Sequence, residues 1–335
     1  MIREALGIVV EGRDLTAEDM ALAMDEIMSG QATAAQIGGL LTALHMKGES
    51  PAEITGAART MRAKATKVKP KAEGLVDTCG TGGDGKRTFN ISTTVALVVA
   101  GAGVPVAKHG NRGVSSGCGS ADVLEALGVK IDLGPEAAAA CIDEAGIGFL
   151  FAPIYHTAMR HVVGARRELG FRTIFNILGP LANPAEVRRQ VIGVYDPDLA
   201  PTLAQVLTDL GTDHSLVVHG AGTADELTLA GASFVYECHG GKIIKYSVSP
   251  SDLGLPEAPI SALAGGDAKK NAEILLAVLG GEKGPRRDVV LLNAAAALIA
   301  ADKAPDFPEG IKQAAQAIDS GAALEALERL RRACA

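Results

Sequence analysis

Short apolar runs that alternate with helix-like patterns constrain the fold of this chain more than any other feature. Strand-length runs such as Val104–Ala107 and Ile147–Phe151 are separated by helix-length segments such as Glu136–Glu144 and Leu199–Leu210. Strands and helices that alternate in this way form parallel sheets, because a parallel connection needs a crossover that covers one face of the sheet. The sequence therefore predicts an α/β protein with a mostly parallel central sheet flanked by helices.

Further patterns complete the expected order of elements. The first 70 residues are expected to be helical, since Thr16 and Ser50 each stand three residues before an acidic residue at a helix start. The basic, proline-containing stretch Lys67–Lys71 is typical of a linker. The other expectations are a helix over Ala121–Leu127, strands over Lys130–Leu133, Val191–Tyr195 and Ser215–Val218, a hairpin over Phe234–Tyr246, and helices over Ala268–Leu279, Asp288–Ala301 and Pro308–Arg332.

Composition excludes several classes of function. The net charge of −7 disfavours a protein that mainly holds a polyanion, and 3% aromatic residues with no Trp leave little to stack on single-stranded bases. The five cysteines form no CxxC pair, as expected of reduced thiols and not of a zinc site. The longest uncharged stretch, Thr88–Ala107, contains Gly and Pro, and the N-terminus is too charged for a signal peptide. We expect a cytoplasmic protein that binds neither nucleic acid nor membrane.

A glycine-rich segment follows the first expected strand of the sheet and precedes a helix. Gly80, Gly82 and Gly85 spell GxGxxG, as in dinucleotide-binding folds. The acidic residue that a dinucleotide site needs about 20 positions later is absent, since that region holds Lys108, and Arg87 stands where a P-loop needs Ser or Thr. Both motifs share glycines that let backbone N–H groups converge on a phosphate at a helix start. We expect a phosphate-binding loop, with a simple tight turn as the alternative.

Three further segments carry polar groups after expected strands or at helix starts. Asn90–Thr94 offers hydroxyls, either as a helix cap or as phosphate and metal ligands. Lys108–Ser120 combines two cations with an amide, hydroxyls and glycines, which is the composition of an anion site. Asp225 and Glu226 suit Mg²⁺, although adjacent carboxylates also favour a helix start through its dipole. Because ligands of open α/β sheets bind at the carboxyl ends of strands, we expect these segments at one edge of the sheet.

Six stretches together resemble the anthranilate phosphoribosyltransferase family. They read DTCGTGGDG, NIST, KHGNRGVSS, GSADVLEALG, RTIFNILGPLANP and GTADELTL. The resemblance extends from the N-terminal helices into the C-terminal third, and the combination of GTGGD with KHGNR is its most specific part. It implies a small helical domain beside a large α/β domain of the nucleoside phosphorylase and phosphoribosyltransferase type, a homodimer, and two Mg²⁺ ions per subunit. The implied reaction moves phosphoribose from phosphoribosyl pyrophosphate (PRPP) to the amine of anthranilate, in tryptophan biosynthesis.

The resemblance also implies roles for individual residues. PRPP binding falls on Gly80, Thr81, Gly83, Asp84, Thr88, Asn90, Ser92, Thr93, Lys108, Asn111 and Ser120. Metal binding falls on Ser92, Asp225 and Glu226, with Glu226 expected to bridge. Anthranilate binding falls on Gly80, His109, Asn111, His156, Arg166, Gly179 and Pro180. The chain departs from the family pattern at Thr157 and at Gly117–Gly119, which bears on the order of the loops and not on the reaction. His45, His161, His214 and His239 are expected to be ordinary surface or core histidines.

The implied domains are discontinuous in sequence. Residues 1–70 with about 156–184 are expected to form the small domain, and 71–155 with 185–335 the large PRPP-binding domain. Arg166 and the Gly179-Pro180 turn would then face the PRPP loops across a cleft, the usual place for a small-molecule site. Arg166 and Arg167 point about 100° apart on the helix expected to start at His156, so only Arg166 is expected to face that cleft. Dimer contacts are expected on the same helical domain.

Two alternative functions remain open at this point. A pyrimidine nucleoside phosphorylase shares the implied architecture and a similar glycine loop, but it uses free phosphate and has no need of Asp225 and Glu226. A nucleic-acid-binding relative without transferase activity is expected to have a basic surface, whereas this chain is acidic overall. Magnesium dependence separates the first alternative from the transferase, and a gel shift with DNA separates the second.

Overall fold

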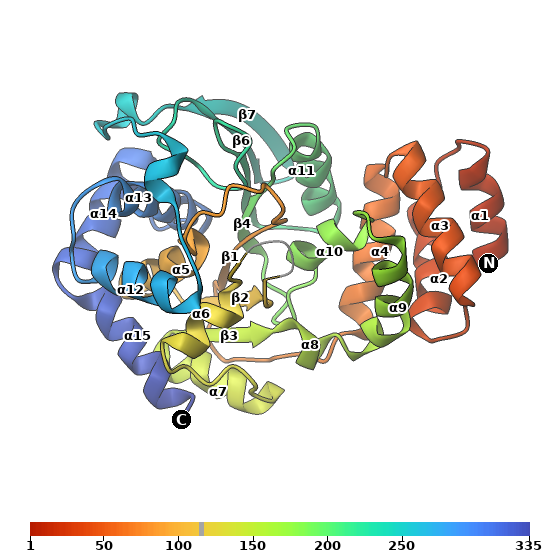
Figure 1. Ribbon diagram of the computed structural model, residues 1–335, viewed down its shortest axis with the longest axis horizontal. Coiled ribbons are helices and arrows are strands. Elements are labelled where there is room, and N and C mark those ends of the chain that lie inside the picture. Colours follow the sequence, from red (N-terminus) through yellow and green to blue (C-terminus); the bar gives the residue numbers. More distant parts are fainter. Residues whose placement is uncertain (114–116) are drawn as a thin grey trace.

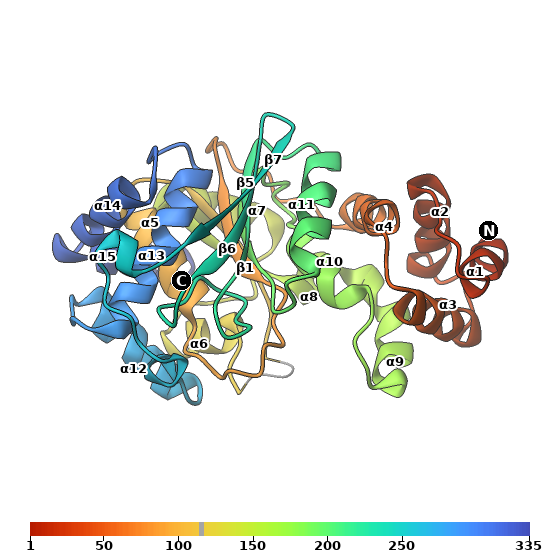
Figure 2. The same ribbon diagram turned by 90° about the horizontal axis from the view of Figure 1, so that it is seen from above.

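The computed structural model describes residues 1–113 and 117–335, so Val114–Ser116 of the Lys108–Ser120 segment lie outside the described residues. Four helices open the chain and lie at one end of the molecule, away from the sheet (Figure 1; Figure 2). They are α1 (Ile2–Val10), α2 (Ala17–Met28), α3 (Ala34–Lys47) and α4 (Pro51–Lys64). The expected helical start of the chain is confirmed.

The expected helix starts at Thr16 and Ser50 are also confirmed. The Thr16 hydroxyl accepts a hydrogen bond from the Asp19 N–H at 3.1 Å. Ser50 and Glu53 form a reciprocal capping box, in which the Ser50 N–H donates to the Glu53 carboxylate at 2.8 Å. Glu53 is fully buried, and it also accepts from Lys47 at 2.9 Å. One carboxylate therefore both caps α4 and ties it to the end of α3.

A seven-stranded sheet forms the centre of the molecule, in the order β3-β2-β1-β4-β5-β6-β7. Neighbouring strands from β3 to β5 pair in parallel, and β6 and β7 add an antiparallel hairpin, as expected. The hairpin turns through Gly240 and Gly241, both with positive φ, which suits a tight turn between twisted strands. The strands are β1 (Val76–Gly80), β2 (Val106–Gly110), β3 (Ile147–Phe151), β4 (Arg189–Gly193), β5 (His214–His219), β6 (Ser233–His239) and β7 (Lys242–Val248).

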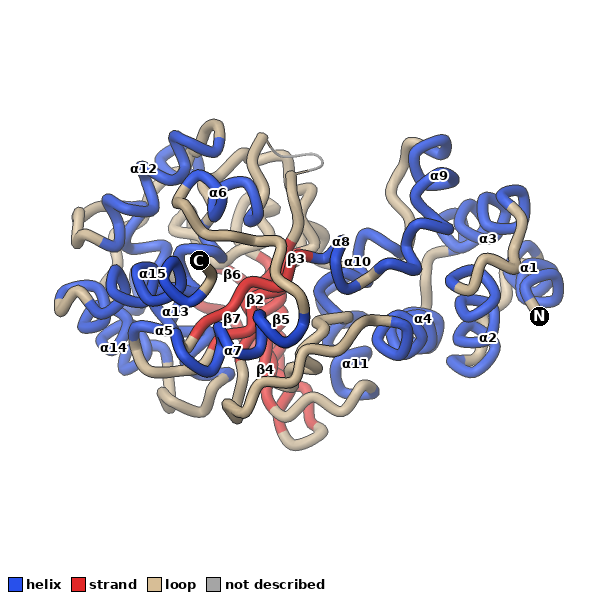
Figure 3. The backbone as a smooth tube through the Cα atoms, turned by 90° about the horizontal axis from the view of Figure 1, so that it is seen from below, coloured by secondary structure: helices blue, strands red, loops and turns tan. Residues whose placement is uncertain are grey.

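Helices cover both faces of this sheet (Figure 3). Alternate strand residues supply two separate cores, because successive side chains point to opposite faces. Val191 and Leu216 belong to the larger core, whereas Ile192 and Val217 belong to the core shared with the N-terminal helices. The helices of the α/β part are α5 (Ile91–Gly101), α6 (Ser120–Ala126), α7 (Pro135–Ala145), α11 (Leu199–Asp209), α12 (Ala268–Leu279), α13 (Pro285–Ala300), α14 (Phe307–Asp319) and α15 (Ala322–Ala333).

Residues 152–181 run from the sheet to the N-terminal helices. They form α8 (Ala152–Tyr155), a 3-10 turn at Thr157–Met159, α9 (Arg160–Leu169) and α10 (Phe175–Leu181). Helix α9 packs against α2 and α3, and α10 packs against α4 (Figure 2). Helix α11 of the α/β part also packs against α4, so the helical end and the sheet share one hydrophobic core.

Three expected elements differ from the structure. Lys130–Leu133 is a loop between α6 and α7 and not a strand. Its apolar side chains, Ile131 and Leu133, are buried in the core although the segment does not pair with the sheet. Pro308–Arg332 is two helices, α14 and α15, which are separated at Gly321 by a positive φ of 80°. No helix begins at His156, whose φ of −109° and ψ of 53° interrupt the chain between α8 and the 3-10 turn.

None of the helices in the described part of the chain combines the length and the apolar character that a membrane span requires.

Candidate active site

The carboxyl ends of the parallel strands bring together the segments that the sequence singled out. The segment with Asp225 crosses the ends of β1 and β4, where both strands carry glycine. A Cβ on Gly80 would lie 2.5 Å from the Asp225 carboxylate, and a Cβ on Gly193 would collide with the Asp225 backbone. Close approach of the two backbones therefore requires glycine at both positions.

Three carboxylates meet between this segment and the β1 loop (residues 81–90). Asp225 accepts a hydrogen bond from the Gly82 N–H at 2.8 Å. Burial, and then the charge of Asp84, raises the pKa of Asp225 to about 7. Burial and the charge of Asp225 raise the pKa of Glu226 well above its usual range. One oxygen of Asp84 is buried with no partner in the described structure.

Such a donor set fits a divalent cation. Mutual repulsion of desolvated carboxylates is unfavourable without a compensating charge, and Mg²⁺ takes carboxylate oxygens together with substrate phosphate. The partnerless Asp84 oxygen and the raised pKa values of Asp225 and Glu226 are the features expected of such a site.

Lys108 lies close to Glu226, one of these carboxylates. Its side chain is only 3% exposed, and its ammonium group donates to the Thr78 carbonyl at 2.5 Å and to the Ser92 hydroxyl at 3.3 Å. Burial lowers the pKa of Lys108, while the charges of Asp77 and Glu226 act in the opposite direction. Lys108 thus joins β1 and β2 to the first turn of α5.

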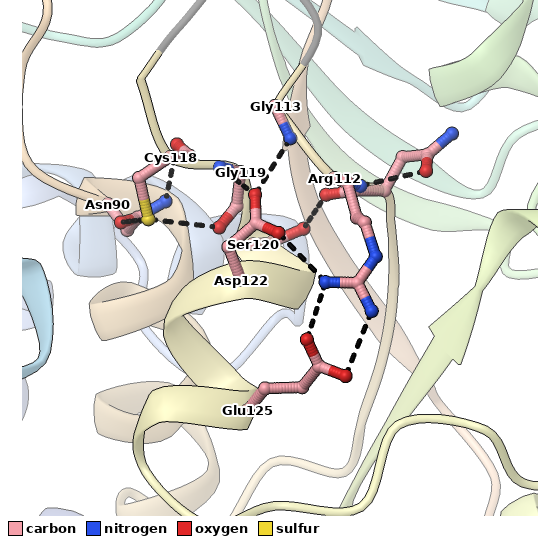
Figure 4. A network of polar contacts seen from close by, with 9 residues as sticks. Asn90, Arg112, Gly113, Cys118, Gly119, Ser120, Asp122 and Glu125 are labelled. Carbon is pink, nitrogen blue, oxygen red and sulfur yellow. Dashed lines mark hydrogen bonds and ion pairs between the residues drawn. The ribbon is translucent and has the colours of Figure 1, made fainter. Parts of the chain in front are cut away.

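The segment after β2 is less positive than its composition predicted. Arg112 donates to Glu125 at 2.5 and 2.9 Å and to Asp122 at 3.0 Å, so α6 supplies acids to one of its two cations (Figure 4). Asp122 also accepts from the N–H groups of Gly113 at 2.9 Å and Gly119 at 2.8 Å. Arg112, one of the two cations counted in this segment, is therefore already paired within the protein, by acids that lie on the following helix.

Two neutral histidines lie where β2 meets α10. The ring centroids of His109 and His156 are 5.1 Å apart, and His109 Nδ1 lies 3.2 Å from the Gly179 carbonyl. Burial lowers the pKa of His109 to about 3 and that of His156 to about 4, so both rings are uncharged at neutral pH. Gly179 and Pro180 were expected to form a turn, but they lie within α10. A Cβ on Gly179 would meet nothing within 4 Å, which places open space beside this part of the helix. Pro180, the next residue, is buried.

Arg166 and Arg167 differ in their exposure to solvent. Arg166 is half-buried, and its guanidinium lies 5.6 Å from the centre of the Phe175 ring. Burial lowers its pKa, and no carboxylate in the described structure forms an ion pair with it. Arg167 is exposed. Arg166 is therefore the cation available to a carboxylate ligand. Among the described residues, no hydrogen bond or ion pair joins Arg166 to the β1 loop.

The other predicted residues lie around the β1 loop and its neighbours. Thr81 donates its N–H to the Gly193 carbonyl at 2.9 Å, and Thr88 pairs with Ala264 in an isolated bridge. Asn90 precedes α5 and accepts from Asn271 at 2.9 Å, and Thr93 is buried. Asn111 accepts from the Arg112 N–H at 2.7 Å, and Ser120 donates to the Asn111 carbonyl at 3.3 Å (Figure 4).

Two parts of the site were not predicted from the sequence. Asp77 is fully buried, and it accepts from Asn183 at 2.8 Å and from the His109 N–H at 3.2 Å. Arg172, between α9 and α10, donates to the Gly83 carbonyl in the β1 loop. Asn183 and Arg172 both lie in the RTIFNILGPLANP stretch, which is the signal that could have drawn attention to them.

Two family models match successive parts of the chain. The helical bundle domain of a glycosyl transferase family matches residues 3–65, and the a/b domain of a glycosyl transferase family matches residues 72–324. An anthranilate phosphoribosyltransferase of Roseiflexus castenholzii is 59% identical over 331 residues, which are 98% of this chain and 97% of the relative. A protein of the same name from Desulforamulus reducens is 56% identical over 330 residues, or 98% of this chain and 96% of the relative.

Solved structures agree with these relatives. The anthranilate phosphoribosyltransferase of Thermus thermophilus matches with a TM-score of 0.94 and 45% identity, over 98% of this chain and 99% of that one. The Saccharomyces cerevisiae enzyme in complex with PRPP and Mg matches with a TM-score of 0.92 and 29% identity, over 99% and 97%. These relatives support neither the nucleoside phosphorylase nor the nucleic-acid-binding alternative. With relatives more than half identical along nearly its whole length, the chain belongs to the anthranilate phosphoribosyltransferase family.

Proposed function

We infer that this chain transfers phosphoribose from PRPP to the amine of anthranilate, giving N-(5-phosphoribosyl)anthranilate and pyrophosphate. One observation carries the proposal: a glycine loop and three carboxylates lie at the same strand ends as two neutral histidines and the open space beside Gly179 of α10. The first group suits a magnesium pyrophosphate, and the second suits an aromatic acceptor.

The donor half of the site holds charge. Magnesium, when bound, neutralises the pyrophosphate that leaves the sugar. Asp225 and Glu226 would hold it together with Ser92, and the partnerless oxygen of Asp84 adds a further donor. Glycines with positive φ at positions 82, 83 and 85 let the β1 loop turn its N–H groups toward phosphate. Thr81, Thr88, Asn90, Thr93, Asn111 and Ser120 complete the proposed PRPP contacts, with Lys108 supporting them.

The acceptor half orients a neutral nucleophile. An aromatic amine is uncharged at neutral pH, so the reaction needs positioning and charge stabilisation of the sugar carbon more than a strong base. His109 and His156 have pKa values near 3 and 4, which keeps the pocket uncharged around the amine. Arg166 would bind the anthranilate carboxylate through paired hydrogen bonds. Gly80, Asn111, Gly179 and Pro180 would line the remaining space.

The proposal has further parts. Residues 1–70 with about 156–184 act as the small domain, as the packing of α9 and α10 on α2, α3 and α4 supports. We propose a cytoplasmic homodimer in which each subunit would hold two magnesium ions, with Glu226 as a ligand for both. Val10, Leu22 and Met46 on the N-terminal helices are 69%, 50% and 82% exposed, which supports dimer contacts on that domain.

Loss of anthranilate fluorescence tests the proposal. We expect a decrease that requires both PRPP and Mg²⁺ and that releases one pyrophosphate for each anthranilate consumed. A reaction of pyrimidine nucleosides with phosphate that needs no Mg²⁺, or no consumption of anthranilate under any of these conditions, would contradict it. Sedimentation of the intact protein tests the dimer separately.

A further inference from the structure

Arg172 joins the helical end of the molecule to the β1 loop. It lies between α9 and α10, which pack against the N-terminal helices. Its guanidinium donates to the carbonyl of Gly83 and stacks 3.9 Å from the centre of the Tyr195 ring, just beyond β4. Within the described structure no carboxylate forms an ion pair with Arg172. The guanidinium of Arg172 thus extends from the segment between α9 and α10 to the β1 loop of the α/β part.

Residues 87–90 of the β1 loop are held by contacts to residues 263–265 and 271, but its glycine-rich part has few contacts to fix its shape. Gly82, Gly83 and Gly85 all have positive φ, with values of 66°, 83° and 69°. Glycine loses more conformational freedom on ordering than any other residue, so a loop of this kind is costly to hold in one shape. Besides Arg172, two hydrogen bonds within the described structure hold residues 81–83 from outside the loop. The Thr81 N–H donates to the Gly193 carbonyl, and the Gly82 N–H donates to the Asp225 carboxylate.

Holding the Gly83 carbonyl also sets the direction of the next N–H group. The described chain has no cis peptide bond. In a trans peptide the C=O of one residue and the N–H of the next point in opposite directions. A guanidinium that holds the Gly83 carbonyl on its side therefore turns the Asp84 N–H away from it. The same contact requires glycine at position 83, because a Cβ there would collide with the Arg172 guanidinium.

We propose that Arg172 is a positioning residue that pre-forms the β1 loop for the pyrophosphate of PRPP, with Tyr195 holding its guanidinium in place. The inference rests on the proposed function, since it assigns a role within that reaction. Arg172 acts through the loop backbone and does not itself contact the substrate. Because Arg172 lies between α9 and α10, the shape of the donor loop depends on the position of the acceptor-binding part.

Arg172→Ala tests this role through the two substrates separately. We expect the KM for PRPP to rise at least about tenfold, because a charge-assisted hydrogen bond is lost and the loop must be ordered by the substrate. The KM for anthranilate at saturating PRPP is expected to change less than about twofold. Arg167→Ala, an exposed arginine on the neighbouring helix, is the matched control and is expected to change neither. An equal rise in both KM values with a fall in the melting temperature would assign Arg172 a merely structural role and overturn the proposal.

Tyr195 variants test the second contact. Tyr195→Leu removes the ring and is expected to raise the KM for PRPP in the same direction as Arg172→Ala, with Tyr195→Phe having a smaller effect. The KM for PRPP of the double variant is expected to be no higher than that of Arg172→Ala alone, because either change removes the same contact between Arg172 and Tyr195. Arg172→Lys should recover only part of the loss, since an ammonium cannot stack its plane on the ring while it donates. Full recovery by Lys together with no effect of Tyr195→Leu would mean that charge acts directly on the pyrophosphate, against the proposal.

Calorimetric titration with PRPP and Mg²⁺, without anthranilate, tests the proposed function and the role of Arg172 separately. Wild-type protein that binds no PRPP would reject the proposed function itself. Wild-type protein that binds PRPP, with an Arg172→Ala variant that binds equally well, would reject only the role of Arg172. The expected result is binding by both proteins, at least about tenfold weaker in the variant.

Discussion

Buried polar groups at the two ends of the sheet differ in whether they have hydrogen-bond partners within the protein. At the amino end of β5, His214 lies between Asp302 at 2.6 Å and Glu237 at 2.9 Å, and Arg189 pairs with Asp302 at 2.5 Å. At the carboxyl ends of the strands, atoms of Asp84, Thr93, His109 and His156 are buried with no hydrogen-bond partner in the described structure. Single side-chain atoms of Thr55, Thr173 and Arg286 are also unpaired, but only these four residues gather at the strand ends. Since buried polar groups are normally paired, we expect a ligand to complete the structure there.

The comparison also separates structural charge from functional charge. The network around His214 is complete within the protein, with Tyr246 donating to Glu237 at 2.8 Å. Asp225 and Glu226 instead have raised pKa values, which means that the protein alone destabilises their charged forms. A completed network serves the fold, and an incomplete one serves a ligand. Each of the following experiments would break or sharpen that distinction.

The largest effect is expected at the carboxylates. Asp225→Asn or Glu226→Gln should lower kcat/KM at least about a hundredfold, since charge stabilisation by a metal ion is worth several kcal/mol. Neither change is expected to lower the melting temperature without Mg²⁺, because each removes a charge that the folded protein disfavours. A Mg²⁺ titration of activity, with thermal unfolding as the control, measures both. The structure has no helix start at this pair, because residues 220–232 lie in a loop between β5 and β6. Wild-type turnover in either variant at ordinary Mg²⁺ would show that the pair does not hold the metal ion.

The next effect is expected at Arg166. A guanidinium that holds a carboxylate by two charge-assisted hydrogen bonds contributes about 1.5 to 3 kcal/mol, so Arg166→Ala should raise the KM for anthranilate roughly ten- to a hundredfold. The KM for PRPP should stay nearly unchanged, and Arg167→Ala should alter neither. Steady-state kinetics with each substrate varied in turn measures the pattern. If Arg166→Ala weakened PRPP instead, the assignment of the acceptor pocket would be wrong.

Local patterns made much of the fold and half of the site predictable. The β1 loop and the Asp225 and Glu226 pair are short motifs at strand ends, and their context follows from the alternation of strands and helices. The hairpin over residues 233–248 was equally readable, because two glycines separate its strands. Lys130–Leu133 was misjudged, since apolar residues in a loop can be buried without pairing in a sheet.

Contacts between distant segments could not be read from the sequence. Arg172 meets Gly83 across 89 residues, and Asn183 meets Asp77 across 106. No spacing rule predicts such pairs, because they depend on how α9 and α10 return to the sheet. Arg112 is an intermediate case. Its acids, Asp122 and Glu125, are three residues apart on α6 and so share one face of that helix. This spacing can be read from the sequence.

The smallest effect is expected at His214, and it concerns stability. Burial opposes the charged ring, but the hydrogen bonds to Glu237 and Asp302 outweigh it and raise the pKa of His214 above its usual value near 6.5. The contribution to stability is therefore fully present below the unfolded-state pKa and is lost as the pH rises through the folded-state value. The same contacts lower the pKa values of both carboxyl groups, for Asp302 against the effect of burial, so these groups stay ionised at pH 5.5.

His214→Gln should accordingly lower the free energy of unfolding more at pH 5.5 than at pH 8.5. We expect a difference of at most about 1 kcal/mol, because Asp302 is 44% exposed and solvent screens its charge. Urea unfolding of both proteins at the two pH values measures it, and the KM values for both substrates at pH 7 are expected to be unchanged. A loss of stability that is equal at both pH values would show that the ring acts through packing against His239, from which its centroid lies 4.1 Å away, and not through its charge. A changed KM in His214→Gln would contradict the distinction between the two ends of the sheet, because a network that is complete within the fold should not affect substrate binding at the other end.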